Sequence, residues 1–349
     1  MSSVRVICIT AALLVASGAA ASAGTPACPG HPDAIGTSRT LVVDPAEHRL
    51  VGTMQYRESL PLEDKEVVLT FDDGPIPPRT TAILDILAAN CVKATFFTVG
   101  QMAKAHPETL KRIHAEGHTI GTHTQTHPMR FRHLSDEKAQ QEVESGIASA
   151  AAALNDPSAV APFVRFPGLG RTDAIEDYLK SRSLMTWSAD FPADDWWPIS
   201  GKTVMQRALD RLEAKGKGIL LLHDIHDRTV DALPGLLREL KARGYRIVHV
   251  VPATPDRPKT PTVSAQWMLR GTADHMSAPG ATRTAAAETH IGTDAQPGPP
   301  LASASKADGP PAPVTRKRVA SRKKHSWRHA PRARRLHQAR HDQSRRATW

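Results

Sequence analysis

The sequence predicts an α/β domain with a parallel sheet and helices packed outside it. From residue 66 onward, short runs of high β propensity alternate with amphipathic helical runs, an order typical of parallel strands joined by helices. Seven strand candidates fall within roughly 185 residues, a length that suits one domain. Seven strands in a segment of this length favour a small, distorted barrel, while an open doubly wound sheet also fits the pattern.

The strand candidates are separated by apolar residues at helical spacing. Ile83, Leu84 and Leu87 show this spacing, and Gly244 is suited to cap the helix before the last strand. Pro234 lies early in that helix, so the sequence does not determine the residue at which the helix begins. The candidates in chain order are residues 66–71, 93–99, 118–122, 163–166, 184–188, 218–222 and 246–250.

The first 23 residues have the pattern of a secretory signal peptide. Arg5 provides a positive start, residues 6–16 are almost entirely apolar, and Ala21-Ser22-Ala23 is a small-residue cleavage site. The apolar run is too short to span a membrane as a helix. We therefore expect an exported protein, in the periplasm or outside the cell, with an uncleaved anchor as the alternative.

Two cysteines would remain after cleavage, Cys28 and Cys91. Thiols in an oxidising compartment commonly pair. The sequence therefore favours a Cys28–Cys91 disulfide that attaches the N-terminal segment to the domain. Spacing does not prove pairing, so two separate thiols are the alternative.

Segments of irregular pattern flank the domain expected at residues 65–251. Residues 24–64 are expected to form a lead-in with a short strand-like piece at 40–43. Residues 252–315 are rich in Pro, Ala, Thr, Gly and Ser and are expected to form a disordered linker, because they bury too little apolar surface to offset chain entropy. Residues 316–349 are expected to form a basic disordered tail.

The net charge of +10 belongs to the end of the chain. Residues 301–349 contain 14 Lys or Arg against Asp308 and Asp342, whereas the remainder is nearly balanced. We expect the tail to contact anionic cell-envelope polymers or lipid headgroups, with a solvated extension as the alternative. Nucleic acid fits the charge as well, but export disfavours it.

Two adjacent carboxylates follow the first buried strand. The apolar run at 67–69 places Asp72 and Asp73 at the end of the predicted strand, and Pro75 is expected to terminate the strand. Neighbouring carboxylates are costly unless a cation neutralises one of them. The pair suits one carboxylate that holds a metal and one that accepts a proton, although Asp-Asp-Gly is also a common solvated turn.

Two histidines follow the third strand candidate, four residues apart. His123 and His127 can bind one metal from a helical turn or a tight loop. His114 and His118 share this spacing, but His114 belongs to a predicted helix. Asp73 with His123 and His127 would leave an open position for water, as catalytic zinc sites do. One divalent ion is therefore expected, with Zn²⁺ favoured and Co²⁺ or another ion compatible.

Three further polar residues stand at predicted carboxyl ends of strands, namely Arg165, Asp190 and His223. Each alone is compatible with a structural or surface role. Barrels of alternating strands and helices carry their active sites at this rim. The coincidence of these residues with Asp72 and His123 therefore indicates a catalytic site.

Together these residues resemble the motifs of the polysaccharide deacetylases, the NodB-type carbohydrate esterases of family 4. Thr-Phe-Asp-Asp-Gly at 70–74 is similar to the first motif, and His-Thr-x-x-His at 123–127 to the second. Arg-Phe-Pro at 165–167 resembles the third, which usually continues with an aromatic residue where this chain has Gly168. The fourth, Asp190 with Asp195-Trp196, is stretched by residues 191–194, and the fifth is Leu221-Leu222-His223.

The resemblance covers residues 65–250 and implies the family's distorted (β/α)7 barrel. It also implies a role for the principal site residues. Asp73, His123 and His127 are implied to bind the metal. Asp72 is implied to be the general base, and His223 the general acid that protonates the leaving amine.

Five further residues have supporting roles by the same resemblance. Arg165 is implied to orient the general base, and Asp190 the general acid. Leu221 is implied to line the acetyl pocket, and Trp196 to form a wall of it. The backbone N–H of Gly168 is implied to stabilise the oxyanion.

The implied function is a metal-dependent hydrolase that removes N-acetyl or O-acetyl groups from a polysaccharide such as chitooligosaccharide or peptidoglycan. An N-acetylated glycan is thus the expected partner. Two alternatives stay open: a non-catalytic carbohydrate-binding module on the same fold, and a deacylase or amidohydrolase of a small non-sugar substrate. The first would lack a base or a metal ligand, and here each of those positions is filled.

Overall fold

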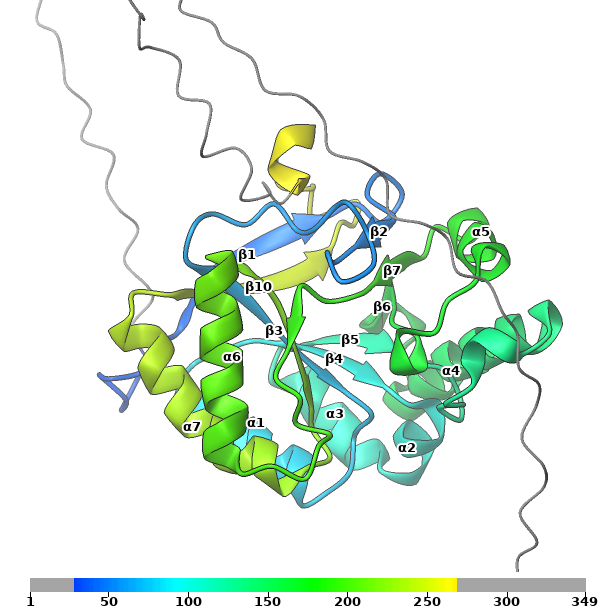
Figure 1. Cartoon of the computed structure of the whole chain (residues 1–349). Helices are drawn as coiled ribbons and strands as arrows, with labels where there is room; N and C mark the ends of the chain where they lie inside the picture. Colours follow the sequence, from blue (N-terminus) through cyan, green and yellow to red (C-terminus); the bar gives the residue numbers. More distant parts are fainter. Residues whose placement is uncertain (1–27, 269–349) are drawn as a thin grey trace, which may run out of the picture. The chain divides into compact units, whose positions relative to one another are not determined.

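A parallel sheet surrounded by helices forms the part of the chain that the computed structural model describes, residues 28–268 (Figure 1). The ladders between named strands are all parallel. This confirms the predicted α/β class. The predicted signal peptide and basic tail, and the linker beyond residue 268, lie outside the described residues. None of the described helices is both long and apolar enough to cross a membrane.

From β3 onward strands alternate with helices, except that α3 follows α2 and β8 follows β7. The strands are β1 (Thr37–Val43), β2 (Leu50–Val51), β3 (Glu66–Asp72), β4 (Thr95–Thr98), β5 (Thr119–Thr122), β6 (Val160–Val164), β7 (Met185–Trp187), β8 (Phe191–Pro192), β9 (Gly218–His223) and β10 (Arg246–Pro252). The helices are α1 (Arg79–Ala89), α2 (Gly100–Ala105), α3 (Pro107–Ala115), α4 (Asp136–Leu154), α5 (Asp173–Ser181), α6 (Gly201–Lys215) and α7 (Asp227–Ala242). Short 3-10 turns are η1 (Phe131–His133), η2 (Pro157–Ala159), η3 (Pro167–Leu169) and η4 (Ser264–Trp267).

Six of the seven predicted strands form a continuous, barrel-like ladder, β9-β3-β4-β5-β6-β7. Strand β8 extends this ladder by pairing with β9. Strand β10, predicted as the seventh, meets β3 only through Arg246 and Ile247 and pairs along its length with β1. The two residues of β8 are too few to produce a recognisable period in the sequence, so the prediction missed this strand.

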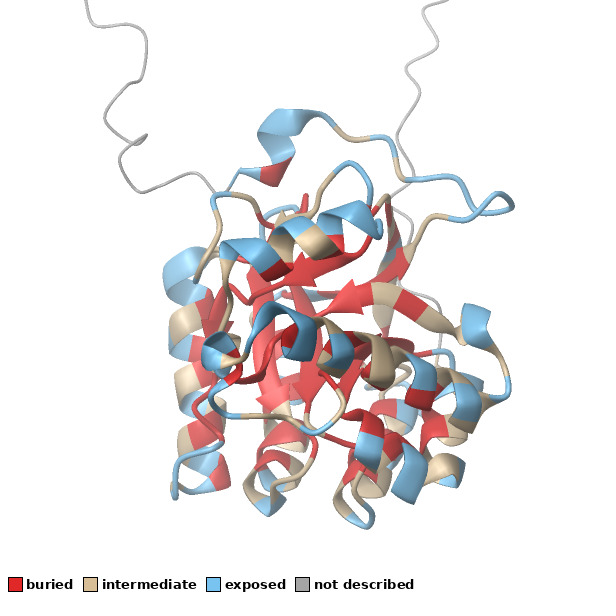
Figure 2. Ribbon diagram, turned by 90° about the vertical axis from the view of Figure 1, so that its right-hand side faces the viewer, coloured by how far each residue is buried: buried red, intermediate tan, exposed pale blue. Residues whose placement is uncertain are grey.

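Side chains alternate between the two faces of β3. Val67, Leu69 and Phe71 belong to the apolar core that includes residues of α1 and α7, whereas Val68 belongs to the core enclosed by the strands. Figure 2 shows the strands buried and the helices exposed on their outer faces. Because side chains on a strand repeat every two residues, Asp72 shares the inner face of Val68.

Two segments expected outside the domain are part of its packing. Strand β1 pairs with β10, so residues 37–43 belong to the sheet and not to a separate lead-in. Trp267 is 3% exposed and stacks on His48 with ring centroids 3.5 Å apart. The prediction of a disordered linker from residue 252 is therefore wrong for residues 252–268. A single buried aromatic residue anchors this segment and leaves no periodic pattern in the sequence.

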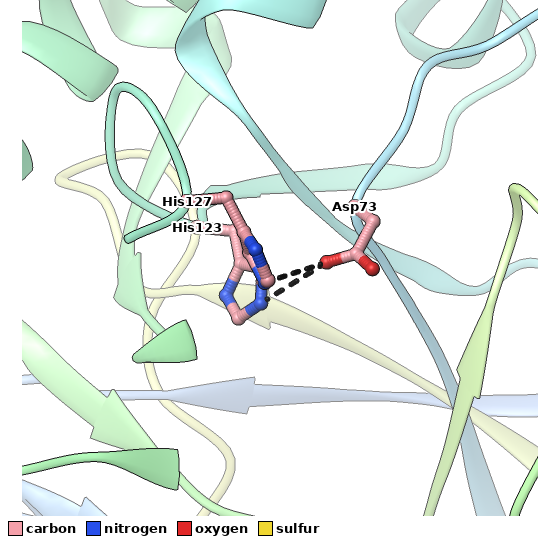
Figure 3. Close-up of side chains that lie close together, drawn as sticks. All are labelled: Asp73, His123 and His127. Carbon is pink, nitrogen blue, oxygen red and sulfur yellow. Dashed lines mark ion pairs between the residues drawn. The ribbon is translucent and has the colours of Figure 1, made fainter. Parts of the chain in front are cut away.

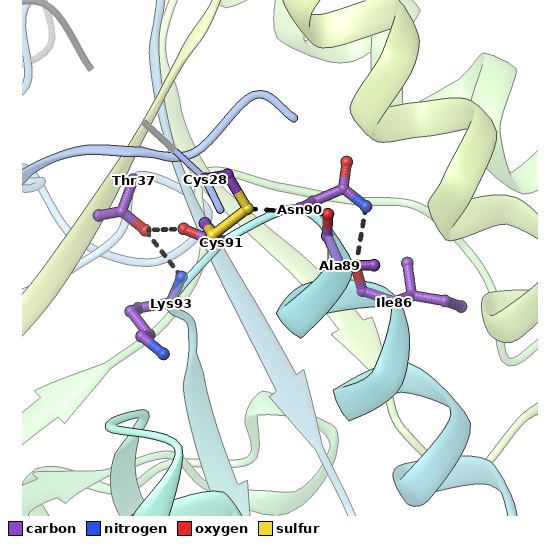
Figure 4. The surroundings of a disulfide bond; sticks show 7 residues. All are labelled: Cys28, Thr37, Ile86, Ala89, Asn90, Cys91 and Lys93. Atoms are coloured by element: carbon purple, nitrogen blue, oxygen red, sulfur yellow. Dashed lines mark hydrogen bonds between the residues drawn. A yellow bond between two sulfur atoms is a disulfide. The ribbon is translucent and has the colours of Figure 1, made fainter. Parts of the chain in front are cut away.

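The predicted disulfide between Cys28 and Cys91 is confirmed. The two sulfur atoms are bonded and the Cα atoms lie 5.7 Å apart, beside the end of α1 (Figure 4). Next to it, the Thr37 hydroxyl donates to the Cys91 carbonyl and accepts from the Lys93 N–H. The bond closes a loop of the chain that contains β1, β2, β3 and α1.

Removing this disulfide should destabilise the domain. The double variant Cys28→Ser, Cys91→Ser is expected to lose about 2–4 kcal/mol of unfolding free energy, because the cross-link restricts the unfolded chain over a long loop. Urea denaturation of both proteins without reductant measures the difference. Reductant should lower the stability of the natural chain to the level of the variant, and equal stabilities without reductant would contradict the prediction.

Candidate active site

The three predicted metal ligands come together at the carboxyl ends of β3 and β5. Asp73 follows β3, and His123 and His127 follow β5. One ligand atom from each side chain lies within 4.8 Å of the others. Asp73 Oδ1 lies 3.4 Å from His123 Nε2 and 3.1 Å from His127 Nε2, and both imidazoles face it (Figure 3).

This donor set fits a divalent cation. Asp73 Oδ1 is buried and has no hydrogen-bond partner among residues 28–268. Burial favours the neutral acid, but the imidazoles outweigh it and hold the pKa of Asp73 well below its ordinary value. His123 Nδ1 donates to the Arg165 carbonyl at 2.6 Å, which leaves Nε2 available as a ligand. One carboxylate and two imidazoles are typical of catalytic zinc sites.

Asp72 stands beside the ligand set and is held by a buried arginine. Arg165 is fully buried, and its Nη1 donates to Asp72 Oδ1 at 2.7 Å. The guanidinium also donates to Thr70 Oγ1 and to the Ser188 carbonyl. The other carboxylate oxygen, Oδ2, lies 3.9 Å from His123 Nε2. Arg165 therefore occupies one oxygen of Asp72 and leaves the other facing the ligand set.

His223 is paired with Asp195 and not, as predicted, with Asp190. Asp195 Oδ1 accepts a hydrogen bond from His223 Nδ1 at 2.7 Å, and Oδ2 accepts one from the His223 backbone N–H at 2.7 Å. Asp195 is fully buried and is held further by the hydroxyl of Thr229. The prediction that Asp190 orients His223 is therefore wrong.

The unrecognised strand β8 explains this error. Because β8 runs parallel to β9, Asp190, which precedes β8, lies beside the beginning of β9 and accepts a hydrogen bond from the Ile219 N–H at 2.7 Å. Asp195 follows β8 and lies beside the end of β9. The four residues of strand from Ile219 to His223 span roughly 13 Å. Only the carboxylate after β8 can reach His223.

Asp195 also determines the protonation of His223. Burial alone would lower the pKa of this imidazole, but the hydrogen bond and charge of Asp195 outweigh burial and raise the pKa to about 9. The structure therefore favours an imidazolium at neutral pH. Its proton is lost only as the pH rises through about 9.

The remaining predicted residues lie around this centre. Leu221 is 5% exposed on β9, two residues before His223 and hence on the same inner face. Trp196 is 43% exposed and meets the His223 ring edge-on with centroids 5.7 Å apart. Gly168 lies in η3, in the loop that follows Arg165. The structure places these residues near the site, while their roles stay predictions.

Asp224, which was not predicted from the sequence, joins the end of β9 to the loop of Asp73. Its Oδ1 accepts from the Gly74 N–H at 2.9 Å, and its Oδ2 from the Thr80 hydroxyl at 2.7 Å. Asp224 is 1% exposed, and burial raises its pKa to about 7. The sequence feature that could have indicated this role is the carboxylate directly after His223, at the end of an apolar strand.

Gly74→Ala should displace Asp73, the predicted metal ligand, through a clash with Asp224. A Cβ atom on residue 74 would overlap the Asp224 carboxylate, so either that side chain or the Asp73 loop must move. We expect about 1–3 kcal/mol of destabilisation, as for other overpacked sites, together with weaker metal binding. Thermal denaturation and metal titration measure the two effects. An unchanged melting temperature with unchanged metal affinity would contradict the prediction.

Comparison with known proteins tests the resemblance noted in the sequence. The family model described as polysaccharide deacetylase matches residues 59–187. A peptidoglycan-N-acetylglucosamine deacetylase of Bacillus cereus is 33% identical over 196 residues, which cover 55% of this chain and 89% of that protein. The chain belongs to the polysaccharide deacetylase family. This confirms the family predicted from the sequence motifs.

One further relative and one solved structure are matched over smaller shares of their length. A peptidoglycan-N-acetylmuramic acid deacetylase of Bacillus subtilis is 31% identical over 58% of this chain and 42% of its own. The chain thus spans less than half the length of that relative. Among solved structures, a peptidoglycan deacetylase of Bdellovibrio bacteriovorus has a TM-score of 0.56 and 34% identity, covering 62% of this chain and 60% of that chain. Similarity of structure therefore supports the same family.

Proposed function

We propose that this polysaccharide deacetylase is an exported hydrolase that removes N-acetyl groups from a glycan. The observation that carries the proposal is the position of Asp72 and His223. They are register partners at the ends of the adjacent strands β3 and β9, next to a set of ligands that fits a metal. A base and an acid on either side of one reacting amide are the groups that its hydrolysis requires.

Asp73, His123 and His127 would hold the divalent ion, with Zn²⁺ as the favoured metal. When bound, such an ion polarises the amide carbonyl and lowers the pKa of a bound water to about 7. Arg165 donates to Asp72 Oδ1, so Oδ2 is the atom that accepts a proton from the attacking water. The Gly168 N–H would donate to the developing oxyanion, which a positioned backbone donor stabilises.

His223 supplies the second proton transfer. Asp195 accepts from Nδ1 and thereby leaves the Nε2 proton to be donated to the amine nitrogen as its bond to carbon breaks. Acetate and a free amino sugar are the products. Leu221 would contact the acetyl methyl group, and Trp196 would form a wall of the substrate groove.

Export is the second part of the proposal. The Cys28–Cys91 disulfide supports it, because structural disulfides persist mainly in oxidising compartments. The predicted signal peptide at residues 1–23 agrees with this location. A glycan of the cell envelope would then be within reach of the enzyme.

Acetate release tests the proposed activity. We expect release from peptidoglycan strands or chitooligosaccharide, complete loss after treatment with a chelator, and recovery on addition of Zn²⁺ or Co²⁺. Acetylated xylan serves as the O-acetyl control. Activity that survives removal of the metal, or activity only on a small non-sugar amide, would contradict the proposal.

A further inference from the structure

A basic cavity adjoins the candidate active site. It has a volume of about 600 Å³, and its lining includes three arginines, Arg130, Arg132 and Arg171, with His133 beside them. No Asp or Glu lines it. Residues 1–300 carry a nearly balanced charge, so the cations are concentrated locally and not part of a generally basic body.

Two loops that carry site residues form the walls of this cavity. Arg130 follows the ligand His127 by three residues, and Gly168, also in the lining, follows Arg165 by three. Three residues of chain span at most about 11 Å. A glycan bound with its acetyl group at the metal ligands would therefore pass close to the cavity.

The arginines of the cavity differ in whether a neighbouring carboxylate neutralises their charge. Arg171 forms ion pairs with Asp173 and Glu176. Arg130 and Arg132 are exposed, and within residues 28–268 neither has a carboxylate within 4 Å. Arg132 Nε donates to His133 Nε2 at 3.3 Å, which leaves the charge of its guanidinium unneutralised. A guanidinium without a carboxylate partner offers a planar fork of donors that suits a carboxylate or a phosphate.

We infer that this cavity binds an acidic substituent of the glycan being deacetylated, so that the enzyme prefers acidic glycans to neutral ones. The inference rests on the proposed function and specifies its class of substrate. The recognised chemistry is a carboxylate or phosphate on a sugar near the acetylated one. Arg130 and Arg132 are the residues that recognise it.

The test compares acetate release from matched glycans in low salt. Peptidoglycan strands freed of stem peptides carry lactyl carboxylates, and the same strands converted to methylamides are neutral. We expect kcat/KM to be about tenfold higher for the acidic strands, with the ratio falling toward one in 0.5 M salt. A phosphorylated chitooligosaccharide beside its unmodified form shows whether phosphate is recognised as well as carboxylate.

Arg130→Gln with Arg132→Gln should remove most of this preference. The matched control, Arg238→Gln with Lys241→Gln, removes two exposed charges near the end of α7, away from the carboxyl ends of the strands, and should keep the ratio of the natural enzyme. A ratio near one in the natural enzyme for both anions, or a ratio that survives the first double variant, would overturn the inference.

Calorimetric binding of the same strands to metal-free protein separates this inference from the proposed activity. Tighter binding of the acidic strands that is lost in the Arg130, Arg132 variant supports the cavity even if no acetate is released. Equal binding of acidic and neutral strands overturns it. Absence of acetate release from every glycan contradicts the proposed function instead.

Discussion

Asp72→Asn is expected to lower kcat by about 10²- to 10⁴-fold while the metal stays bound, because the variant loses the proton acceptor and keeps all three ligands. The asparagine carbonyl can still accept from Arg165, so the position of the side chain should be retained. Acetate release and metal content measured on the same sample give the result.

His127→Ala provides the contrast to this variant. It removes one of the three ligands, so both metal and activity should be lost. A fully active Asp72→Asn enzyme would contradict the assignment of the base. Full metal content in His127→Ala would contradict the ligand set.

Asp195→Asn should move the alkaline limit of activity. In the natural enzyme, kcat/KM is expected to fall as the pH rises through about 9, where His223 loses its proton. Asp195 is the largest cause that opposes burial, so the pKa of His223 should fall when its charge is removed. The variant should therefore lose activity at a lower pH than the natural enzyme, which a pH–rate profile measures.

The same pair also links stability to pH. Because the pKa of His223 is raised on folding, its contribution to stability is fully present below about pH 6.5 and is lost as the pH rises through about 9. Asp190→Asn is the matched control. It removes a carboxylate that accepts from Thr53 and Ser59, so it should lower stability without moving the alkaline limit. An alkaline limit that moves with Asp190 and not with Asp195 would contradict the observed pairing.

The positions of Asp72, Asp73 and His123 could be predicted because each residue stands at or directly after the end of a strand. Asp72 ends a strand of seven buried residues, Asp73 follows it, and His123 directly follows another strand. The carboxyl ends of parallel strands share one rim, so these side chains had to meet. Alternation along β3 and β9 then placed Leu221 and His223 on the inner face.

The partner of His223 was not predictable by the same reasoning. Asp190 and Asp195 both stand near the end of a strand candidate, and the choice between them depends on the two-residue strand β8. Strands of this length have no detectable period. Asp224 was missed for a related reason, since its role depends on a contact with Gly74, 150 residues away in the chain.

The stacking of Trp267 on His48 determines how far the chain can be truncated from its C-terminus without loss of a contact of the domain. A chain that stops before Trp267 would expose the face of His48 on which Trp267 stacks. A change in the binding or activity of such a chain would then reflect damage to the domain and not the loss of the tail. Experiments that ask what the basic tail contributes should therefore cut after Met268, so that the stacking of Trp267 on His48 and the bridge between Glu58 and Met268 are kept.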